Sequence, residues 1–207
     1  MEEEKTILVQ IPEEIENLKL PNPNLIEYYK NYNDRYIFVD TSIDEALLDA
    51  SRQIMRYNIQ DKNIEIDKRK RIFVYIYSYG GDLNVAYSFI AMCEMSKTPI
   101  VTINMGIAYS SGLLILLAGK ERYCFRRSQA MIHTGSSGMS GSYEQMRENQ
   151  KSYDKMIEQM GEYILQKTNI NKKTFNKNKD KDWYLTDVEQ VNYGIVDRIV
   201  DNIDEIL

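Results

Sequence analysis

The sequence of 207 residues has a single histidine, His133, and only two cysteines, Cys93 and Cys124. One histidine excludes a histidine-rich metal site, so any histidine chemistry depends on His133 alone. Two cysteines provide neither a disulfide framework nor the ligand spacing of a zinc site, and we expect no metal. Both lie in apolar or strand-like surroundings, which predicts buried free thiols.

Long apolar runs and an excess of positive charge are also missing. The longest apolar run, residues 113–118, is far shorter than the roughly 20 residues of a membrane-spanning helix. The first five residues do not place a basic segment before an apolar one, so we expect no signal peptide and a cytoplasmic protein. The chain has 26 basic and 31 acidic residues, a net charge of −5, and no basic aromatic patch. We therefore expect neither a membrane nor a nucleic acid as partner.

The remaining composition is that of an ordinary globular protein. With 43% apolar and 28% charged residues, the chain is long enough for one domain with a substantial core. Residues 1–34 contain three of the four prolines, at positions 12, 21 and 23, and we interpret them as an N-terminal arm. Residues 35–207 are interpreted as a single domain.

Apolar runs alternate with helical patterns along that domain. We predict helices beginning near Ser42, Ser142 and Thr186, because each is followed three residues later by Glu or Gln, the spacing of a capping box. Further helices are predicted after residues 82 and 112, and residues 169–181 are predicted to be a polar loop with one helical turn at most. Strands are predicted at residues 36–40, 72–77, 100–104, 121–125, 129–132 and 195–200. This order is typical of an α/β sheet with right-handed crossovers.

The helix predicted at residues 142–168 is unusually long. An average helix has about 11–12 residues. Met and Tyr recur at helical spacing along it. A long helix that exposes such side chains indicates contact with another subunit.

Ser110 stands where a predicted buried strand meets a predicted helix. An apolar run follows Ser110-Ser111-Gly112 directly. A serine at such a junction has an exposed hydroxyl and free backbone N–H groups beside it, as an acyl-transfer nucleophile requires. The alternative is that Ser110 and Ser111 only cap a core helix.

The pair Gly80-Gly81 also lies between a strand and a helix. One interpretation is a tight turn that requires positive φ. The other is that the missing side chains let a second backbone or an oxyanion approach the Gly81 N–H. A phosphate cradle is disfavoured, because no Lys-Ser/Thr follows and Asp82 would repel a phosphate.

His133 ends a short predicted strand and precedes a glycine-bearing segment. A histidine there is exposed enough to act as a general base, although it can equally be a tolerated polar residue. An aspartate would orient its ring. Spacing alone does not choose among the candidates, which are Asp154, Asp180, Asp182 and Asp187.

Together these motifs resemble one family, the proteolytic subunit of the Clp protease. The similarity spans residues 35 to about 200. The motifs, in the family's order and near its spacing, are Tyr-Ser-Tyr-Gly-Gly-Asp (77–82), Met-Gly-Ile-Ala-Tyr-Ser-Ser-Gly-Leu-Leu (105–114), Ala-Met-Ile-His (130–133), Asp-Trp-Tyr-Leu-Thr (182–186) and Val-Asn-Tyr-Gly-Ile-Val-Asp (191–197). The resemblance implies an α/β, ClpP/crotonase-like fold of repeated strand–helix units with a protruding handle helix.

The resemblance also implies residue roles. Ser110 matches the nucleophile, His133 the general base and Asp182 the third member of a catalytic triad. The backbone N–H groups of Gly81 and Ser111 match the oxyanion hole. The substrate-binding positions are Gly80, Gly135 and Ser136; the last two lie in the segment after His133, which is similar to the strand that pairs with an extended peptide in this family.

The implied protein is a serine endopeptidase that cleaves peptides and unfolded polypeptides inside a ring-shaped homo-oligomer. The ring would be a heptamer or a stacked double heptamer, joined through the handle helix. No cofactor is implied, since ATP is used only by a separate Clp-type ATPase. The alternative is a non-catalytic structural subunit of a mixed ring. A crotonase-like acyl-CoA enzyme shares the layout but would not need Ser110 and His133 together.

Two departures from the family pattern stand beside these motifs. Tyr77-Ser78-Tyr79 replaces the family's Asn-Ser-Pro, and Trp183 replaces a basic residue. The N-terminal arm has no clear match to the family's axial loop, although Phe73 and Tyr75 fall near its ATPase-docking pocket.

Overall fold

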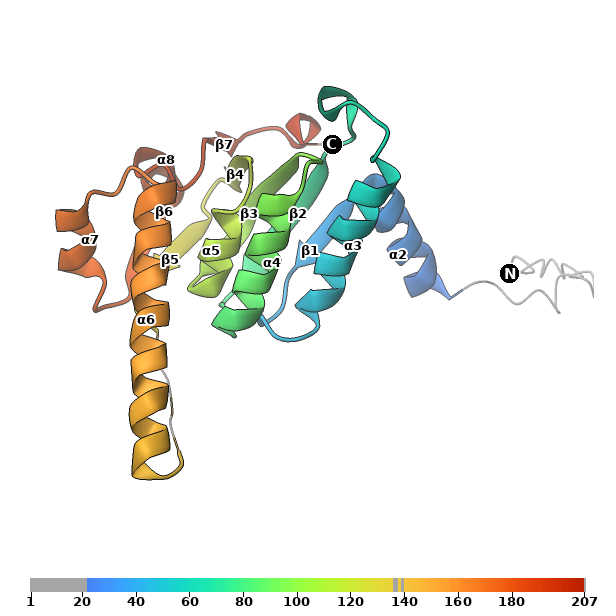
Figure 1. Ribbon diagram of the computed structural model, residues 1–207. Helices are drawn as coiled ribbons and strands as arrows, with labels where there is room; N and C mark the ends of the chain where they lie inside the picture. The colour runs from blue at the N-terminus through green and yellow to red at the C-terminus, as the bar shows by residue number, and fades with distance from the viewer. Residues whose placement is uncertain (1–21, 136–137, 139, 207) are drawn as a thin grey trace, which may run out of the picture.

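The computed structural model describes residues 22–135, 138 and 140–206. Over these residues, strands and helices alternate to form one predominantly parallel sheet (Figure 1). The strands are β1 (Tyr36–Val39), β2 (Ile72–Ser78), β3 (Ile100–Tyr109), β4 (Glu121–Phe125), β5 (Gln129–Ile132), β6 (Trp183–Thr186) and β7 (Arg198–Val200). The helices are α2 (Pro23–Asp34), α3 (Leu47–Gln60), α4 (Leu83–Met95), α5 (Ser111–Leu116), α6 (Tyr143–Lys167), α7 (Lys172–Asn178) and α8 (Asp187–Asn192), with short 3-10 turns at Ile66–Lys68 and Ile203–Glu205.

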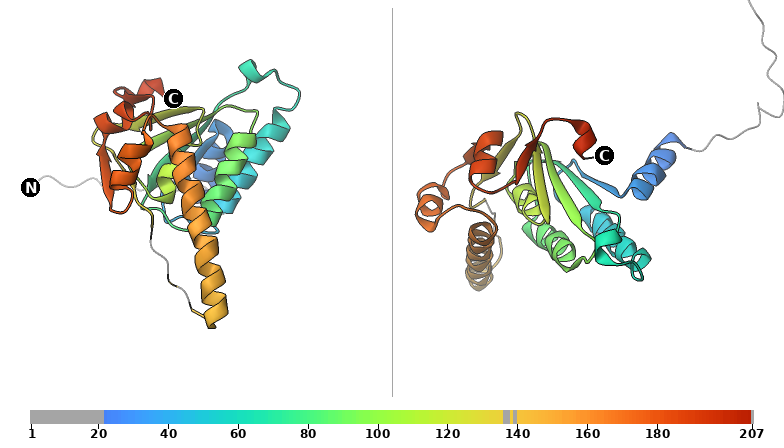
Figure 2. Two further views of the ribbon diagram at one scale, coloured as in Figure 1. Left: turned by 60° about the vertical axis from the view of Figure 1, so that its left-hand side comes forward. Right: turned by 90° about the horizontal axis from the view of Figure 1, so that it is seen from above.

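The sheet has the order β1-β2-β3-β4-β7, and all of these neighbours are parallel. Helices α3, α4 and α5 cover one face (Figure 2), where most of the buried apolar side chains gather. A smaller cluster that includes Phe73, Val101 and Ile206 lies apart from this main core. Strand β2 is buried at nearly every position rather than alternately, because its side chains enter the main core on one face and the smaller cluster on the other. The predicted α/β fold is confirmed.

Strand β3 is the centre of the fold because it has two sets of partners. Its first half pairs with β4, and residues Ile107, Ala108 and Tyr109 pair with β5. Asn104 lies at the change of partner and is fully buried; its side-chain amide donates to the Gln129 carbonyl over 2.9 Å. The carboxyl ends of β3 and β5 therefore meet, which brings the residues that follow them together.

Helix α6 has 25 residues and extends well beyond the sheet (Figure 1). Its predicted capping box is present, with Ser142 and Gln145 each bonding to the other's backbone. Only Met160, Gly161 and Ile164, in the second half, are buried. The predicted long protruding helix is confirmed, and so is the capping box of α8 at Thr186.

The predicted capping box at Ser42 is wrong. Helix α3 begins at Leu47, and the Asp44 carboxylate accepts the Ala46 N–H instead. The backbone of Ile43 is held by a neighbouring turn: its N–H donates to the Gly80 carbonyl, and its carbonyl accepts the N–H of Asp82. This tertiary pairing overrides the local signal.

Three elements were not predicted. Helix α2 lies within the predicted arm, residues 1–21 of which are outside the described residues. Helix α7 is longer than a single turn and buries Phe175. Strand β6 pairs antiparallel with β5, and the last predicted strand, residues 195–200, shortens to β7.

The two cysteines, Cys93 and Cys124, are free and buried, as predicted. Within the described ranges, no helix combines the length and the apolar character needed to cross a membrane.

Candidate active site

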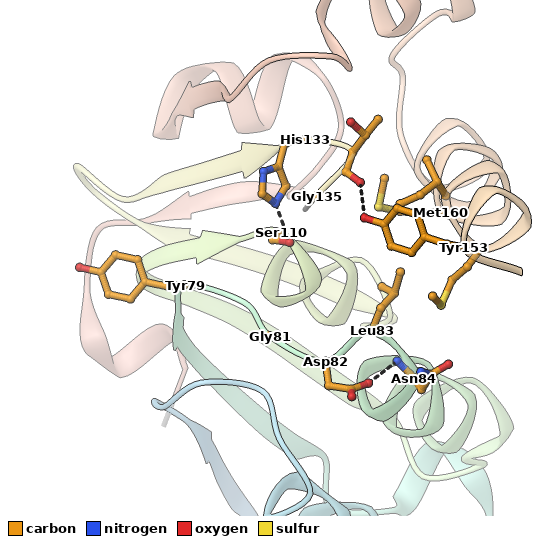
Figure 3. Close-up of a pocket in the computed structure, with 13 residues that line it drawn as sticks. Tyr79, Gly81, Asp82, Leu83, Asn84, Ser110, His133, Gly135, Tyr153 and Met160 are labelled. Atoms are coloured by element: carbon orange, nitrogen blue, oxygen red, sulfur yellow. Dashed lines mark hydrogen bonds between the residues drawn. The ribbon is translucent and has the colours of Figure 1, made fainter. Parts of the chain in front are cut away.

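Ser110 occupies a strained backbone position between β3 and α5. Its φ of 53° and ψ of −124° are rare for a residue with a side chain and cost roughly 1–3 kcal/mol. Hydrogen bonds hold it there: its N–H donates to the Met131 carbonyl over 3.0 Å, and its carbonyl accepts the Leu113 N–H over 3.0 Å. The turn directs the hydroxyl out of the sheet toward His133 (Figure 3).

His133 follows β5 and joins Ser110 to Asp182. Its Nε2 lies 2.9 Å from Ser110 Oγ, and its Nδ1 lies 3.2 Å from Asp182 Oδ1. Because a carboxylate only accepts hydrogen bonds, Nδ1 carries the proton and Nε2 accepts from the Ser110 hydroxyl. The His133 side chain is 25% exposed and that of Asp182 57% exposed, so the chain of bonds is open to solvent at its Asp182 end. An arrangement of this kind can remove the serine proton and retain it on the imidazole.

Among the four candidate aspartates, Asp182 is the one that contacts His133. Asp154 accepts the side-chain amide of Gln150 over 2.7 Å. Asp187 accepts the Arg127 N–H over 2.7 Å, and this bond holds the pKa of its carboxyl below the usual range. Asp182 reaches its position because β6, which follows it directly, pairs with β5, which precedes His133.

The glycine pair forms the other wall of the site. Gly80 has φ of 99°, and a Cβ on it would lie 2.7 Å from the Cβ of Ser110. A Cβ on Gly81 would lie 2.2 Å from the Ile43 carbonyl oxygen. Both interpretations of the pair are therefore compatible with this structure: the turn needs positive φ, and two backbones pass close to it.

The N–H groups of Gly81 and Ser111 belong to segments that touch. The Ser111 hydroxyl donates to the Gly81 carbonyl over 3.3 Å. Neither of the two N–H groups donates to another residue in the part of the chain that the structure describes. Such donors beside a nucleophile are suited to an oxyanion.

A cavity of about 470 Å³ opens beside Ser110 (Figure 3). One side of it is apolar and is formed by Leu83, at the start of α4, and by Met156, Ile157 and Met160 of α6. Gly135 lines it too, with φ of 79°. Of the predicted substrate-binding residues, Gly80 and Gly135 thus flank the site, whereas Ser136 falls outside the described residues.

Sequence analysis missed two residues that hold this site together. Tyr153, on α6, donates to the Thr134 carbonyl over 3.2 Å. Thr134 in turn donates its N–H to the Lys179 carbonyl over 3.2 Å. Tyr153 is one of the Met and Tyr residues that recur at helical spacing along the long helix, but nothing in that spacing indicated a polar contact.

No three His, Cys, Asp or Glu side chains form a group that could hold a metal ion within the described residues.

Comparison with known proteins gives one consistent family. A sequence model of the Clp protease family matches residues 24–203. The ATP-dependent Clp protease proteolytic subunit 2 of Treponema denticola is 30% identical over 84% of this chain and 85% of its own length. Subunit 1 of Bacillus cereus is 27% identical over 92% of this chain and 97% of its own. The solved structure of a ClpP1 mutant from Listeria monocytogenes shares the fold, with a TM-score of 0.73 and 23% identity, over 86% of this chain and 98% of that one.

Proposed function

The chain belongs to the Clp protease family, and we propose that it is a serine endopeptidase that cleaves peptides and unfolded polypeptides. The observation that carries the proposal is the continuous set of hydrogen bonds from Ser110 through His133 to Asp182. These residues come from three separate parts of the chain, yet they lie in the order that acyl transfer needs.

The reaction begins when Ser110 Oγ attacks the scissile carbonyl carbon and His133 Nε2 takes the hydroxyl proton. Asp182 holds the ring in the required tautomer and stabilises the imidazolium. The N–H groups of Gly81 and Ser111 stabilise the oxyanion. The C–N bond then breaks, His133 gives its proton to the leaving amine, and water releases the acyl group by the same steps in reverse.

The cavity beside Ser110 binds the acyl half of the substrate. An extended chain that pairs with the backbone around Gly135 places a side chain against Leu83 and Met160. The apolar lining favours apolar side chains at that position.

Ring assembly is proposed from the family and from helix α6. The free half of this helix exposes Tyr143 and Met146, which suits contact with a second ring. We propose a heptamer or a stacked double heptamer, with ATP hydrolysed only by a separate Clp-type ATPase. The Tyr75 ring stacks with Phe38, which is 44% exposed, at 5.2 Å and with Phe73 at 6.4 Å, and this group suits the proposed ATPase contact.

The test is hydrolysis of a fluorogenic peptide and of an unfolded protein by the full chain, with native mass measured on the same samples. Ser110→Ala and His133→Ala are expected to lower turnover by about 10⁶-fold, to background. Ser88→Ala is the matched control, because Ser88 is exposed on α4, outside the site. An intact ring that hydrolyses neither substrate, even with a Clp ATPase added, would contradict the proposal and favour a structural subunit.

A further inference from the structure

Three tyrosines form a continuous aromatic surface next to Ser110. We call Tyr79, Tyr109 and Tyr184 the tyrosine platform. The Tyr79 and Tyr109 rings meet edge to face at 5.8 Å and 79°, and those of Tyr109 and Tyr184 at 5.5 Å and 76°. Each tyrosine is a near chain neighbour of a site residue: Tyr79 precedes Gly80, Tyr109 precedes Ser110, and Tyr184 is two residues after Asp182.

The platform is rigid at its centre and open at its two ends. The hydroxyl of Tyr109 donates to the Gln129 side-chain carbonyl over 2.7 Å, which fixes the central ring. Tyr184 is held by the pairing of its backbone with Met131. Tyr79 is nevertheless 70% exposed and Tyr184 50% exposed. Rings this open and this well oriented are characteristic of a surface that binds a ligand.

Tyr79 lines the mouth of the apolar cavity, but its ring lies on the other side of Ser110 from Leu83 and Met160 and points away from them (Figure 3). A polypeptide that crosses Ser110 has its acyl half on one side and its leaving amine on the other. Because the acyl half pairs with the backbone around Gly135, the leaving half passes over Tyr79.

We propose that the tyrosine platform is a subsite for the leaving half of the substrate and binds an aromatic side chain within the first two residues after the scissile bond. This inference rests on the proposed function and deepens it. An aromatic side chain is favoured because edge-to-face packing within the platform leaves the outer ring faces of Tyr79 and Tyr184 free for another ring. A contact of this kind increases the specificity constant about 3- to 10-fold.

The experiment compares two sets of substrates with the same acyl half. One set is internally quenched peptides with Phe, Ala, Glu or Arg after the scissile bond. The other is a peptidyl methyl ester, whose leaving group, methanol, is too small to contact the platform. Specificity constants are measured for the full chain, Tyr79→Ala, Tyr79→Phe and Tyr184→Ala. Tyr29→Ala is the matched control, because Tyr29 is 56% exposed on α2.

The native chain is expected to prefer Phe over Ala by about 3- to 10-fold. Tyr79→Ala and Tyr184→Ala should lose most of this preference, Tyr79→Phe should retain it, and Tyr29→Ala should not change it. The methyl ester should lose less activity than the Phe peptide in Tyr79→Ala and Tyr184→Ala, since its leaving group does not reach the platform, and Tyr29→Ala should change the hydrolysis of neither substrate.

Three results would overturn the inference. The first is an unchanged preference for Phe in Tyr79→Ala and Tyr184→Ala while the methyl ester is still hydrolysed. The second is an equal loss on both substrate sets, which would make Tyr79 a support of the glycine turn. The third is a preference for Arg rather than Phe. Absence of both peptide and ester hydrolysis by the native chain would instead overturn the proposed function, and this inference with it.

Discussion

The hydroxyl of Tyr153 donates a hydrogen bond to the carbonyl oxygen of Thr134, with 3.2 Å between the two oxygens. Thr134 follows His133 directly, and its own N–H donates to the Lys179 carbonyl, three residues before Asp182. The long helix, the segment after the general base and the segment before the aspartate are therefore joined at one residue, Thr134. This arrangement makes Tyr153 a positioning residue for the triad.

Replacing Tyr153 with phenylalanine should lower kcat about 3- to 10-fold with little change in KM, because one neutral hydrogen bond is lost while the ring remains. The measurement is steady-state hydrolysis of a coumarin amide. Tyr163→Phe is the matched control, since this hydroxyl on the same helix is buried and has no hydrogen-bond partner within the described residues. Equal effects of the two substitutions would contradict a positioning role for Tyr153.

Gly80→Ala should reduce activity at least about 100-fold and also destabilise the fold. The new Cβ would lie 2.7 Å from the Cβ of Ser110, and φ of 99° is strained for alanine. Gly106→Ala is the control, because a Cβ there meets only the exposed ring of Tyr77. Peptide hydrolysis and thermal unfolding would be compared. If Gly80→Ala is as active as Gly106→Ala, the close approach at Gly80 is not needed for function.

Asp61→Asn should destabilise the domain by about 3 kcal/mol, because it leaves Arg35 without its buried partner. The guanidinium donates to both Asp61 carboxylate oxygens, over 2.6 and 2.7 Å, and the Asp61 side chain is 1% exposed. The free energy of unfolding in urea measures the effect. Asp49→Asn removes an exposed pair with Arg52 and should change stability by less than about 1 kcal/mol.

The same ion pair predicts how stability depends on pH. Hydrogen bonding to Arg35 lowers the pKa of Asp61 from its ordinary value of 3.8, and the Thr98 hydroxyl adds to this effect against the cost of burial. The unfolded chain therefore binds the proton more readily than the folded one. The contribution of the pair is fully present above pH 3.8 and is lost as pH falls through the lowered folded value. In Asp61→Asn the free energy of unfolding should depend less on pH in this acidic range. An unchanged pH dependence would contradict the assignment.

Local signals predicted local features well. The capping boxes at Ser142 and Thr186 formed because each needs only residues within four positions. The box at Ser42 did not form, because the Ile43 backbone bonds to Gly80 and Asp82 from another part of the chain. Strand β6 was missed for a related reason, since among the described residues it pairs with β5 alone, and that strand lies about 50 residues earlier in the sequence.

For the candidate site too, the sequence predicted the local features but not the tertiary contacts. The junction at Ser110 and the strand end at His133 are visible in the local pattern, but spacing left four aspartates open. The segment between His133 and Asp182 includes helices α6 and α7, so only tertiary structure decides which carboxylate returns to the ring. The family resemblance named Asp182, whereas the contact of Tyr153 and the tyrosine platform depend on tertiary structure.

The central claim is that Ser110 is an activated nucleophile. It is tested most directly by treating the full chain with a fluorophosphonate and locating the adduct by peptide mass spectrometry. We predict a single adduct on Ser110, formed by the native chain and by Ser88→Ala but not by Ser110→Ala, and formed far more slowly by His133→Ala. An intact oligomer that forms no adduct on Ser110, alone or with a Clp ATPase, would contradict the account.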